Sequence, residues 1–155
     1  MLNLKLTSPS YCKLGFADID CILTIEERVY THPWTRGNFT DSLLSGYAAF
    51  GFRDSEHELF AYFFVMPILD ELHLLNFAVD SPYQGQGHAR LLIDKLFEYA
   101  LEQGYVSILL EVRRSNERAI AIYQKAGFAA IGVRKGYYPA HDNQREDAIV
   151  MRRAC

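Results

Sequence analysis

The chain has 155 residues, of which half are hydrophobic and 23% are charged, and its net charge is -3. This length predicts one domain over residues 1–155, and the composition excludes long disordered segments. A mildly acidic chain argues against nucleic acid as the main partner and is compatible with a basic or amine substrate. The apolar runs are shorter than the roughly 18 residues of a membrane helix, so we expect no membrane partner.

The cysteines Cys12, Cys21 and Cys155 are odd in number and show no Cys-x-x-Cys spacing. They therefore predict neither a disulfide framework nor a zinc site. Residues 1–5 lack the basic start and the apolar core of a secretory signal. We expect a cytoplasmic protein with reduced thiols and no bound metal.

The first half of the chain shows two helical patterns followed by three strand patterns. Apolar periodicity predicts a helix over residues 14–30, capped at Asp18 or nearby, and then a short helix over residues 36–45. Strands are predicted over the ranges 47–52, 59–66 and 71–79. Short polar turns separate these strands, which indicates an antiparallel meander.

The second half alternates helices with strands. The predicted helices are 90–102 and 117–126, and the predicted strands are 105–112, 128–133 and 147–151. A long loop is expected over residues 135–143. Because a strand, a crossover helix and a strand follow one another, we expect one parallel pair in the sheet.

A glycine-bearing turn connects the strand predicted over residues 71–79 to the helix that begins near residue 90. Gly85 and Gly87 let a ligand approach the backbone, and the first amides of a helix attract anions. The turn therefore predicts a pyrophosphate site. The alternative is that the glycines only make a tight connection. No Lys-Ser or Lys-Thr follows them, which excludes a Walker A loop.

Glu111 lies near the end of an apolar strand. Burial there is expected to raise the pKa of its carboxyl group and to make it a proton acceptor. The alternative is a charge at the wet edge of the sheet that pairs with Arg113 or Arg114. Its position in the sequence leaves both interpretations open.

Asn116 and Tyr123 are seven residues apart, so they lie two turns apart on one helix face, about 10 Å along the axis. One ligand running along this face could meet both. Alternatively, Asn116 is only the cap of the helix, and Tyr123 is a core residue with its hydroxyl group at the surface.

The pattern Gln84-x-x-Gly87-x-Ala89 resembles the acyl-CoA signature of the GCN5-related N-acetyltransferases (GNAT). A second set of motifs resembles one subfamily, the bacterial ribosomal-protein-alanine N-acetyltransferases of the RimI type. These motifs are His32-Pro33-Trp34, Asn76-Phe77-Ala78-Val79, Leu110-Glu111-Val112-Arg113-x-Ser115-Asn116, Ala119-Ile120-x-Ile122-Tyr123-x-x-x-Gly127-Phe128, Tyr137-Tyr138-Pro139 and Glu146-Asp147-Ala148. The likeness covers the chain from about Phe16 onward.

The resemblance implies an α/β fold with a twisted, mostly antiparallel sheet, a parallel pair at the acyl-CoA site and about four flanking helices. It also implies acetyl-CoA as cosubstrate. The residues implied to bind it are Phe77, Ala78, Val79, Gln84, Gly85, Gln86, Gly87, His88, Ala89 and Asn116. A backbone amide near Val79 is expected to polarise the thioester carbonyl.

The mechanism implied by the resemblance is direct attack of an amine on acetyl-CoA. Glu111 would accept the proton of the amine, directly or through water, and Tyr123 would protonate the departing thiolate. Trp34, Tyr137 and Tyr138 would line the acceptor groove. Trp34 has an alternative role, in which it only packs the first two helices together.

The implied reaction is acetylation of the N-terminal alanine of a ribosomal small-subunit protein. The alternatives are a GNAT enzyme that acts on lysine or small amines, and a non-catalytic acyl-CoA-binding module. The acidic residues Glu146 and Asp147 could receive a basic peptide or could be solvated strand-end charges. Family members often have Arg or Lys inside the phosphate turn, whereas this turn reads Gln84-Gly85-Gln86-Gly87-His88 with Arg90 just beyond it, and residues 1–13 match poorly. The oligomeric state is left open, with a monomer among the alternatives.

Overall fold

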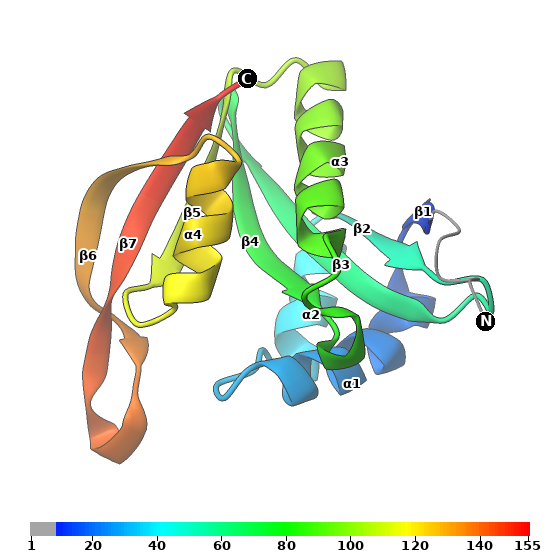
Figure 1. Cartoon of the computed structure of the whole chain (residues 1–155), viewed down its shortest axis with the longest axis horizontal. Coiled ribbons are helices and arrows are strands. Elements are labelled where there is room, and N and C mark those ends of the chain that lie inside the picture. Colours follow the sequence, from blue (N-terminus) through cyan, green and yellow to red (C-terminus); the bar gives the residue numbers. More distant parts are fainter. Residues whose placement is uncertain (1–8) are drawn as a thin grey trace. The chain divides into compact units, whose positions relative to one another are not determined.

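The computed structural model describes residues 9–155 (Figure 1). The chain forms two compact units, Met1–Val65 with Asn76–Leu92, and Met66–Leu75 with Ile93–Cys155. The prediction that residues 1–5 carry no export signal lies outside the described residues. The single domain over residues 1–155 stays a prediction.

The first unit contains the first two helices and the antiparallel strands of the meander. Its elements, three of which continue into the second unit, are β1 (Ser10–Lys13), α1 (Ile19–Val29), α2 (Arg36–Leu44), β2 (Ala48–Arg53), β3 (Leu59–Ile68), β4 (Glu71–Val79) and α3 (His88–Glu102). β1 pairs with β2 and β2 pairs with β3, each antiparallel. Buried residues alternate with less buried ones along β2 and are continuous over the first seven residues of β3, as the apolar pattern of the sequence predicts.

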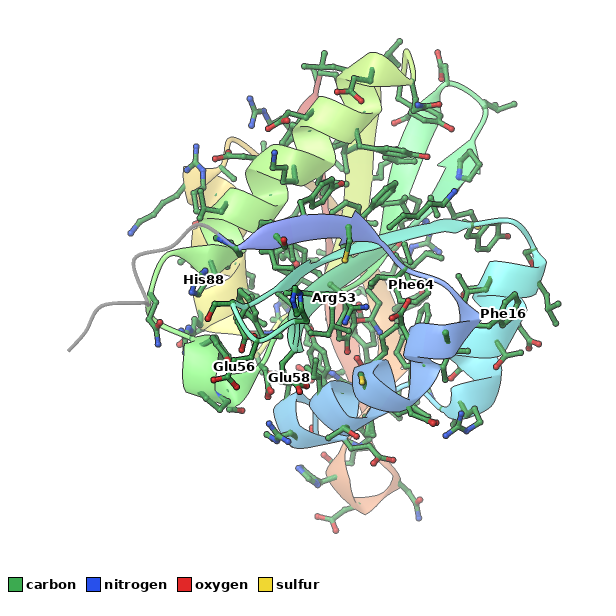
Figure 2. All side chains as sticks on the ribbon, turned by 90° about the vertical axis from the view of Figure 1, so that its right-hand side faces the viewer. Phe16, Arg53, Glu56, Glu58, Phe64 and His88 are labelled. Carbon is green, nitrogen blue, oxygen red and sulfur yellow. The ribbon has the colours of Figure 1, made fainter. Side chains whose placement is uncertain are left out.

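α1 begins later than the helix predicted over residues 14–30. The residues Phe16–Asp18 form a 3-10 turn, and the carboxylate of Asp18 accepts a hydrogen bond from the amide of Gly15 at 2.8 Å. Because Gly15 has extended backbone angles, the α-helix can start only after this turn. Arg53 at the end of β2, labelled in Figure 2, donates to Asp18 at 2.5 Å and fixes this start.

A buried carboxylate lies at the centre of the first unit. Glu26 on α1 is only 2% exposed. Its oxygens accept hydrogen bonds from the Tyr62 hydroxyl at 2.6 Å, the Trp34 amide at 3.0 Å and the Asn76 side-chain amide at 3.1 Å. One side chain thus connects α1, β3, β4 and the turn before α2, and a buried charge of this kind is tolerated because three donors satisfy it.

Replacing Glu26 with Ala is expected to lower the free energy of unfolding by about 3–5 kcal/mol, since each buried donor left without an acceptor costs about 1–3 kcal/mol. The neighbouring Glu27 is exposed, so Glu27→Ala is the matched control and should change stability by less than about 0.5 kcal/mol. Urea unfolding of both variants tests this. Equal stabilities of the two variants would contradict the role given to Glu26.

The second unit contains the rest of the strands and α4. Its further elements are β5 (Ser107–Arg113), α4 (Glu117–Lys125), β6 (Ala129–Pro139) and β7 (Arg145–Ala154). β4 pairs with β5 in parallel, with His73 opposite Leu109, and β5 and β6 both pair with β7 antiparallel. Asn116 caps α4, because its Oδ1 accepts a hydrogen bond from the Ala119 amide at 3.2 Å.

The loop predicted over residues 135–143 is wrong. β6 continues through Pro139 and forms a long hairpin with β7, which Figure 1 shows at the end of the chain. The pairing tolerates a register shift between Arg134 and Tyr138. Within this irregularity the Gly136 amide donates to Asp147 at 2.9 Å. This bond and the pairing with β7 hold residues in β6 that look like a loop in the sequence.

The seven strands in residues 9–155 follow the hydrogen-bonded order β1-β2-β3-β4-β5-β7-β6. The sheet is mostly antiparallel with a parallel β4–β5 pair, and this described part of the chain has four α-helices, which confirms the predicted fold class. Within residues 9–155, the helices are all too short or too polar to span a bilayer.

Candidate active site

The phosphate turn between β4 and α3 has the backbone expected of an anion site. Gly85 and Gly87 have φ angles of 76° and 86°, a region that favours glycine, and nothing lies within 4 Å of the place where a Cβ would stand. Among residues 9–155, no backbone carbonyl accepts a hydrogen bond from the amides of residues 85–89. These amides, together with the start of α3, can therefore donate to a diphosphate.

His88 opens α3 (labelled in Figure 2) and is less suited to supply positive charge than the sequence suggests. Its ring packs edge-on against Phe60 at 4.8 Å, and its Nδ1 is buried without a hydrogen-bond partner within the described part of the chain. Burial lowers the pKa of His88, which favours the neutral ring at neutral pH. An anion placed at this turn would therefore be attracted mainly by the amides and the helix dipole.

Gly87→Ala is expected to raise the KM for acetyl-CoA about tenfold, because Ala at a positive φ costs about 1 kcal/mol or more and shifts the amides that face the phosphates. The kcat at saturating acetyl-CoA should change less than twofold. Gly37 in α2 has no positive φ, so Gly37→Ala serves as the control. A normal KM for the Gly87 variant, measured by initial rates, would contradict this use of the turn.

The strand segment predicted to bind the acyl group is held by the C-terminal end of α1, by the residue that follows it, and by Gln84. Tyr30 donates its hydroxyl to the carbonyl oxygen of Phe77. Arg28 donates to both oxygens of the buried Asp80 at 2.9 and 2.7 Å, and Gln84 donates to the carbonyl of Val79 at 2.8 Å. These contacts hold the end of β4 and the beginning of the turn in one conformation. The sequence did not identify Arg28 and Tyr30. Polar residues at the end of a helix are usually exposed, and nothing in their local sequence shows that they contact residues about 50 positions later.

Glu111 on β5 has only 9% of its side chain exposed and has two basic partners. His73 Nε2 lies 2.7 Å from its Oε1, and the guanidinium Nε of Arg134 lies 3.2 Å from its Oε2. The alternative pairing with Arg113 or Arg114 is wrong. The sequence could not identify His73 and Arg134, since they come from β4 and β6.

The predicted rise in the pKa of Glu111 is also wrong. Burial raises the pKa, but the hydrogen bond and charge of His73 and the charge of Arg134 outweigh it, so the pKa lies below its ordinary value. Glu111 is therefore ionised at neutral pH. It can orient a donor or receive a proton that the reaction has made acidic.

Tyr123 on α4 is buried, with 8% of its area exposed, and its ring lies 5.7 Å from that of Phe128. Burial, followed by the influence of Tyr138, raises the pKa of Tyr123. Its hydroxyl group thus keeps its proton at neutral pH and can act as an acid toward a thiolate. The alternative interpretation placed this hydroxyl group at the surface. The burial of Tyr123 does not fit that placement.

The aromatic pair on β6 is held from both sides. The rings of Tyr137 and Tyr138 lie 4.9 Å apart, edge to face. Arg113 stacks over Tyr138 at 4.6 Å and donates to the Pro139 carbonyl at 2.7 Å. Burial, followed by the charge of Glu111, raises the pKa of Tyr138.

Two acidic residues of β7 brace this segment. Glu146 accepts hydrogen bonds from Arg113 at 3.0 Å and from the Ser115 hydroxyl at 3.1 Å, and Asp147 pairs with Arg114 at 3.3 Å. These carboxylates are therefore engaged within the chain. They are neither simply solvated nor open receptors for a basic peptide.

The ring contacts of Trp34 join α2 to β3, whereas the alternative interpretation expected Trp34 to pack the first two helices together. Its ring lies 5.1 Å from Phe39 of α2 and 6.2 Å from Phe64 of β3, which is labelled in Figure 2. Trp34 also lines a shallow groove of about 530 Å³ with Glu27 of α1 and Arg36 of α2. No residue of the phosphate turn lines this groove.

The predicted site residues fall into two groups. The first unit holds Trp34, Phe77, Ala78, Val79 and the turn residues 84–89, and the second holds Glu111, Asn116, Tyr123, Tyr137 and Tyr138. In residues 9–155, no three His, Cys, Asp or Glu side chains are grouped so as to hold a metal ion.

The site has the features of an acyl-CoA-dependent transferase. These features are a glycine-bearing phosphate turn, a strand that ends directly before this turn, a carboxylate and a buried tyrosine.

The model of the acetyltransferase (GNAT) family matches residues 19–128. The [ribosomal protein bS18]-alanine N-acetyltransferase of Escherichia coli K12 is 37% identical over 138 residues, which cover 89% of this chain and 92% of that protein. A putative enzyme of the same name from Bacillus subtilis is 34% identical, with 94% and 95% covered.

Solved structures agree with these relatives. The crystal structure of the ribosomal-protein-S18-alanine N-acetyltransferase from Escherichia coli has a TM-score of 0.88 at 34% identity and covers 95% of this chain and 94% of its own. Arabidopsis thaliana NAA60 in complex with acetyl-CoA has a TM-score of 0.83 at 15% identity, with 95% and 98% covered, which shows the shared fold.

The chain belongs to the acetyltransferase (GNAT) family. It is an N-acetyltransferase that uses acetyl-CoA, so the alternative of a non-catalytic module is set aside.

Proposed function

We propose that this enzyme acetylates the α-amine of the N-terminal alanine of ribosomal protein bS18. The observation that carries the proposal is the 37% identity, over nearly the whole chain, to an enzyme named for this reaction. An α-amine has a pKa near 8, against about 10.4 for lysine, so it needs less help to become the neutral nucleophile. We also propose that the enzyme works in the cytoplasm.

In the proposed reaction the amine attacks the thioester carbon directly, without a covalent enzyme intermediate. The amides of residues 85–89 hold the diphosphate of acetyl-CoA, and the end of β4 with Asn116 holds the pantetheine arm. A backbone amide near Val79 stabilises the oxyanion. Glu111 draws the proton from the amine nitrogen, which becomes acidic once the C–N bond forms, and Tyr123 protonates the CoA thiolate.

Trp34, Tyr137 and Tyr138 are proposed to contact the acceptor peptide. The ring contacts of Tyr138 with Arg113 and of Trp34 with Phe39 support this use, because they make rigid aromatic surfaces whose order does not have to be created on binding.

A panel of acceptors tests the proposal. The protein is incubated with acetyl-CoA and one of three acceptors: a peptide beginning Ala-Arg with a free α-amine, a blocked peptide with an internal lysine, or a polyamine. Release of CoA thiol is followed over time. Release with the Ala peptide alone supports the proposal. Release confined to the lysine peptide or the polyamine would contradict it and favour a GNAT enzyme for side-chain or small amines.

A further inference from the structure

His73 is a basic group that the mechanism above does not use. It lies on β4, and the parallel register places it opposite Leu109, two residues before Glu111 on β5. Residues two apart on a strand share a face, so His73 and Glu111 are diagonal neighbours on one side of the sheet. Their side chains meet at 2.7 Å between Nε2 and Oε1.

The charges around Glu111 decide how this contact is protonated. Because Glu111 is ionised, its Oε1 can only accept, so Nε2 of His73 carries the hydrogen. Arg134 already supplies a permanent positive charge to the other oxygen, at 3.2 Å. When the imidazole is neutral, it can donate through Nε2–H to this carboxylate, and Nδ1 is then the nitrogen that can take a proton.

Burial strengthens the hydrogen bond between His73 and Glu111. The side chain of His73 is 15% exposed and that of Glu111 is 9% exposed, so the hydrogen bond is poorly screened while the ring still reaches water. A carboxylate that accepts from one imidazole nitrogen orients the ring and stabilises the imidazolium formed when the other nitrogen takes a proton. Histidine is also the side chain whose ordinary pKa best suits proton transfer near neutral pH.

We propose that His73 and Glu111 form a catalytic dyad in which the proton lost by the attacking amine comes to rest on Nδ1 of His73. The proposal rests on the acetyl transfer described above and refines its proton step. The amine nitrogen gains the acetyl carbon and loses one proton, which a water molecule carries to Nδ1 of His73, while Nε2–H stays hydrogen-bonded to Glu111. Glu111 begins and ends as a carboxylate. The thiolate receives its proton from Tyr123, and the imidazolium returns the borrowed proton to Tyr123 through solvent.

Three variants separate proton transfer from positioning. Glutamine in place of His73 keeps an N–H donor for Glu111 but has no basic nitrogen, whereas alanine removes both. We expect His73→Gln and His73→Ala each to lower kcat at least tenfold, with the KM for acetyl-CoA changed less than twofold. Added imidazole should restore part of the activity of His73→Ala. His57→Asn, in an exposed turn between β2 and β3, is the control and should keep the activity of the unmodified enzyme.

The acceptor in this experiment is whichever amine of the panel the unmodified enzyme acetylates. A failure of the alanine specificity is then visible in the unmodified enzyme, and it does not affect the comparison of variants. If His73→Gln retains full kcat, His73 only positions Glu111 and the dyad is overturned. If imidazole does not restore His73→Ala while His73→Gln is active, the same conclusion follows.

Discussion

Glu111→Gln is expected to lower kcat by about 10²–10³, because a group that accepts or stabilises the transferred proton typically contributes 10²–10⁴ to the rate. Glutamine keeps the shape of the side chain and an oxygen for His73 but loses the charge. The KM for acetyl-CoA should stay within about twofold. The pH optimum should move upward, since the variant depends more on amine that is already neutral, and α-amines have a pKa near 8.

Glu98→Gln is the control for this experiment, because Glu98 lies on α3 with 57% of its side chain exposed. Initial rates between pH 6 and 9.5 measure both variants. An unchanged rate and pH profile for Glu111→Gln would remove this residue from the proton step.

The lowered pKa of Glu111 also has a consequence for stability. The folded protein holds this carboxylate ionised at a pH where the unfolded chain, with a pKa near 4.3, begins to protonate it. Its contribution is therefore present above about pH 4.3 and is lost as the pH falls through the lower folded value.

Tyr123→Phe is expected to lower kcat by about 10²-fold, since phenylalanine fills the same buried space but cannot protonate the thiolate. The raised pKa of Tyr123 keeps the hydroxyl protonated throughout the neutral range, so the loss should not depend on pH between 6 and 9. CoA binding, measured by calorimetry, should be retained. Tyr105→Phe, a residue that precedes β5, is the control.

A stronger loss with acetyl-CoA than with a thioester whose leaving thiolate is more stable would confirm that the hydroxyl acts on the leaving group. An equal loss with both thioesters would contradict that assignment and leave Tyr123 as a packing residue.

Local signals explain which parts of the fold could be predicted. Strand β4 has the predicted bounds because an apolar run and the turn that follows it, with one proline and two glycines, both appear in the sequence, and the Asn116 cap has its own short pattern. The hairpin of β6 and β7 was missed over residues 135–143 because Gly136 and Pro139 look like loop residues. Only the distant partners Arg145 and Asp147 show otherwise.

The same limit applies to the site. The phosphate turn is a contiguous motif and could be found, whereas the partners of Glu111 come from two other strands. A histidine between leucines on β4 has no local feature that connects it with a glutamate 38 residues later. The sequence also gives Glu26 and Glu27 the same appearance, although one is buried and the other is exposed.

The bond between Glu26 and Trp34 runs through the main chain of Trp34 and leaves the indole out. Any residue other than proline at position 34 can keep this anchor, because every such residue has the required amide. If Trp34 contacts the acceptor as proposed, random mutagenesis of this one codon diversifies the side chain that meets the acceptor, while every variant except proline keeps the main-chain bond to Glu26.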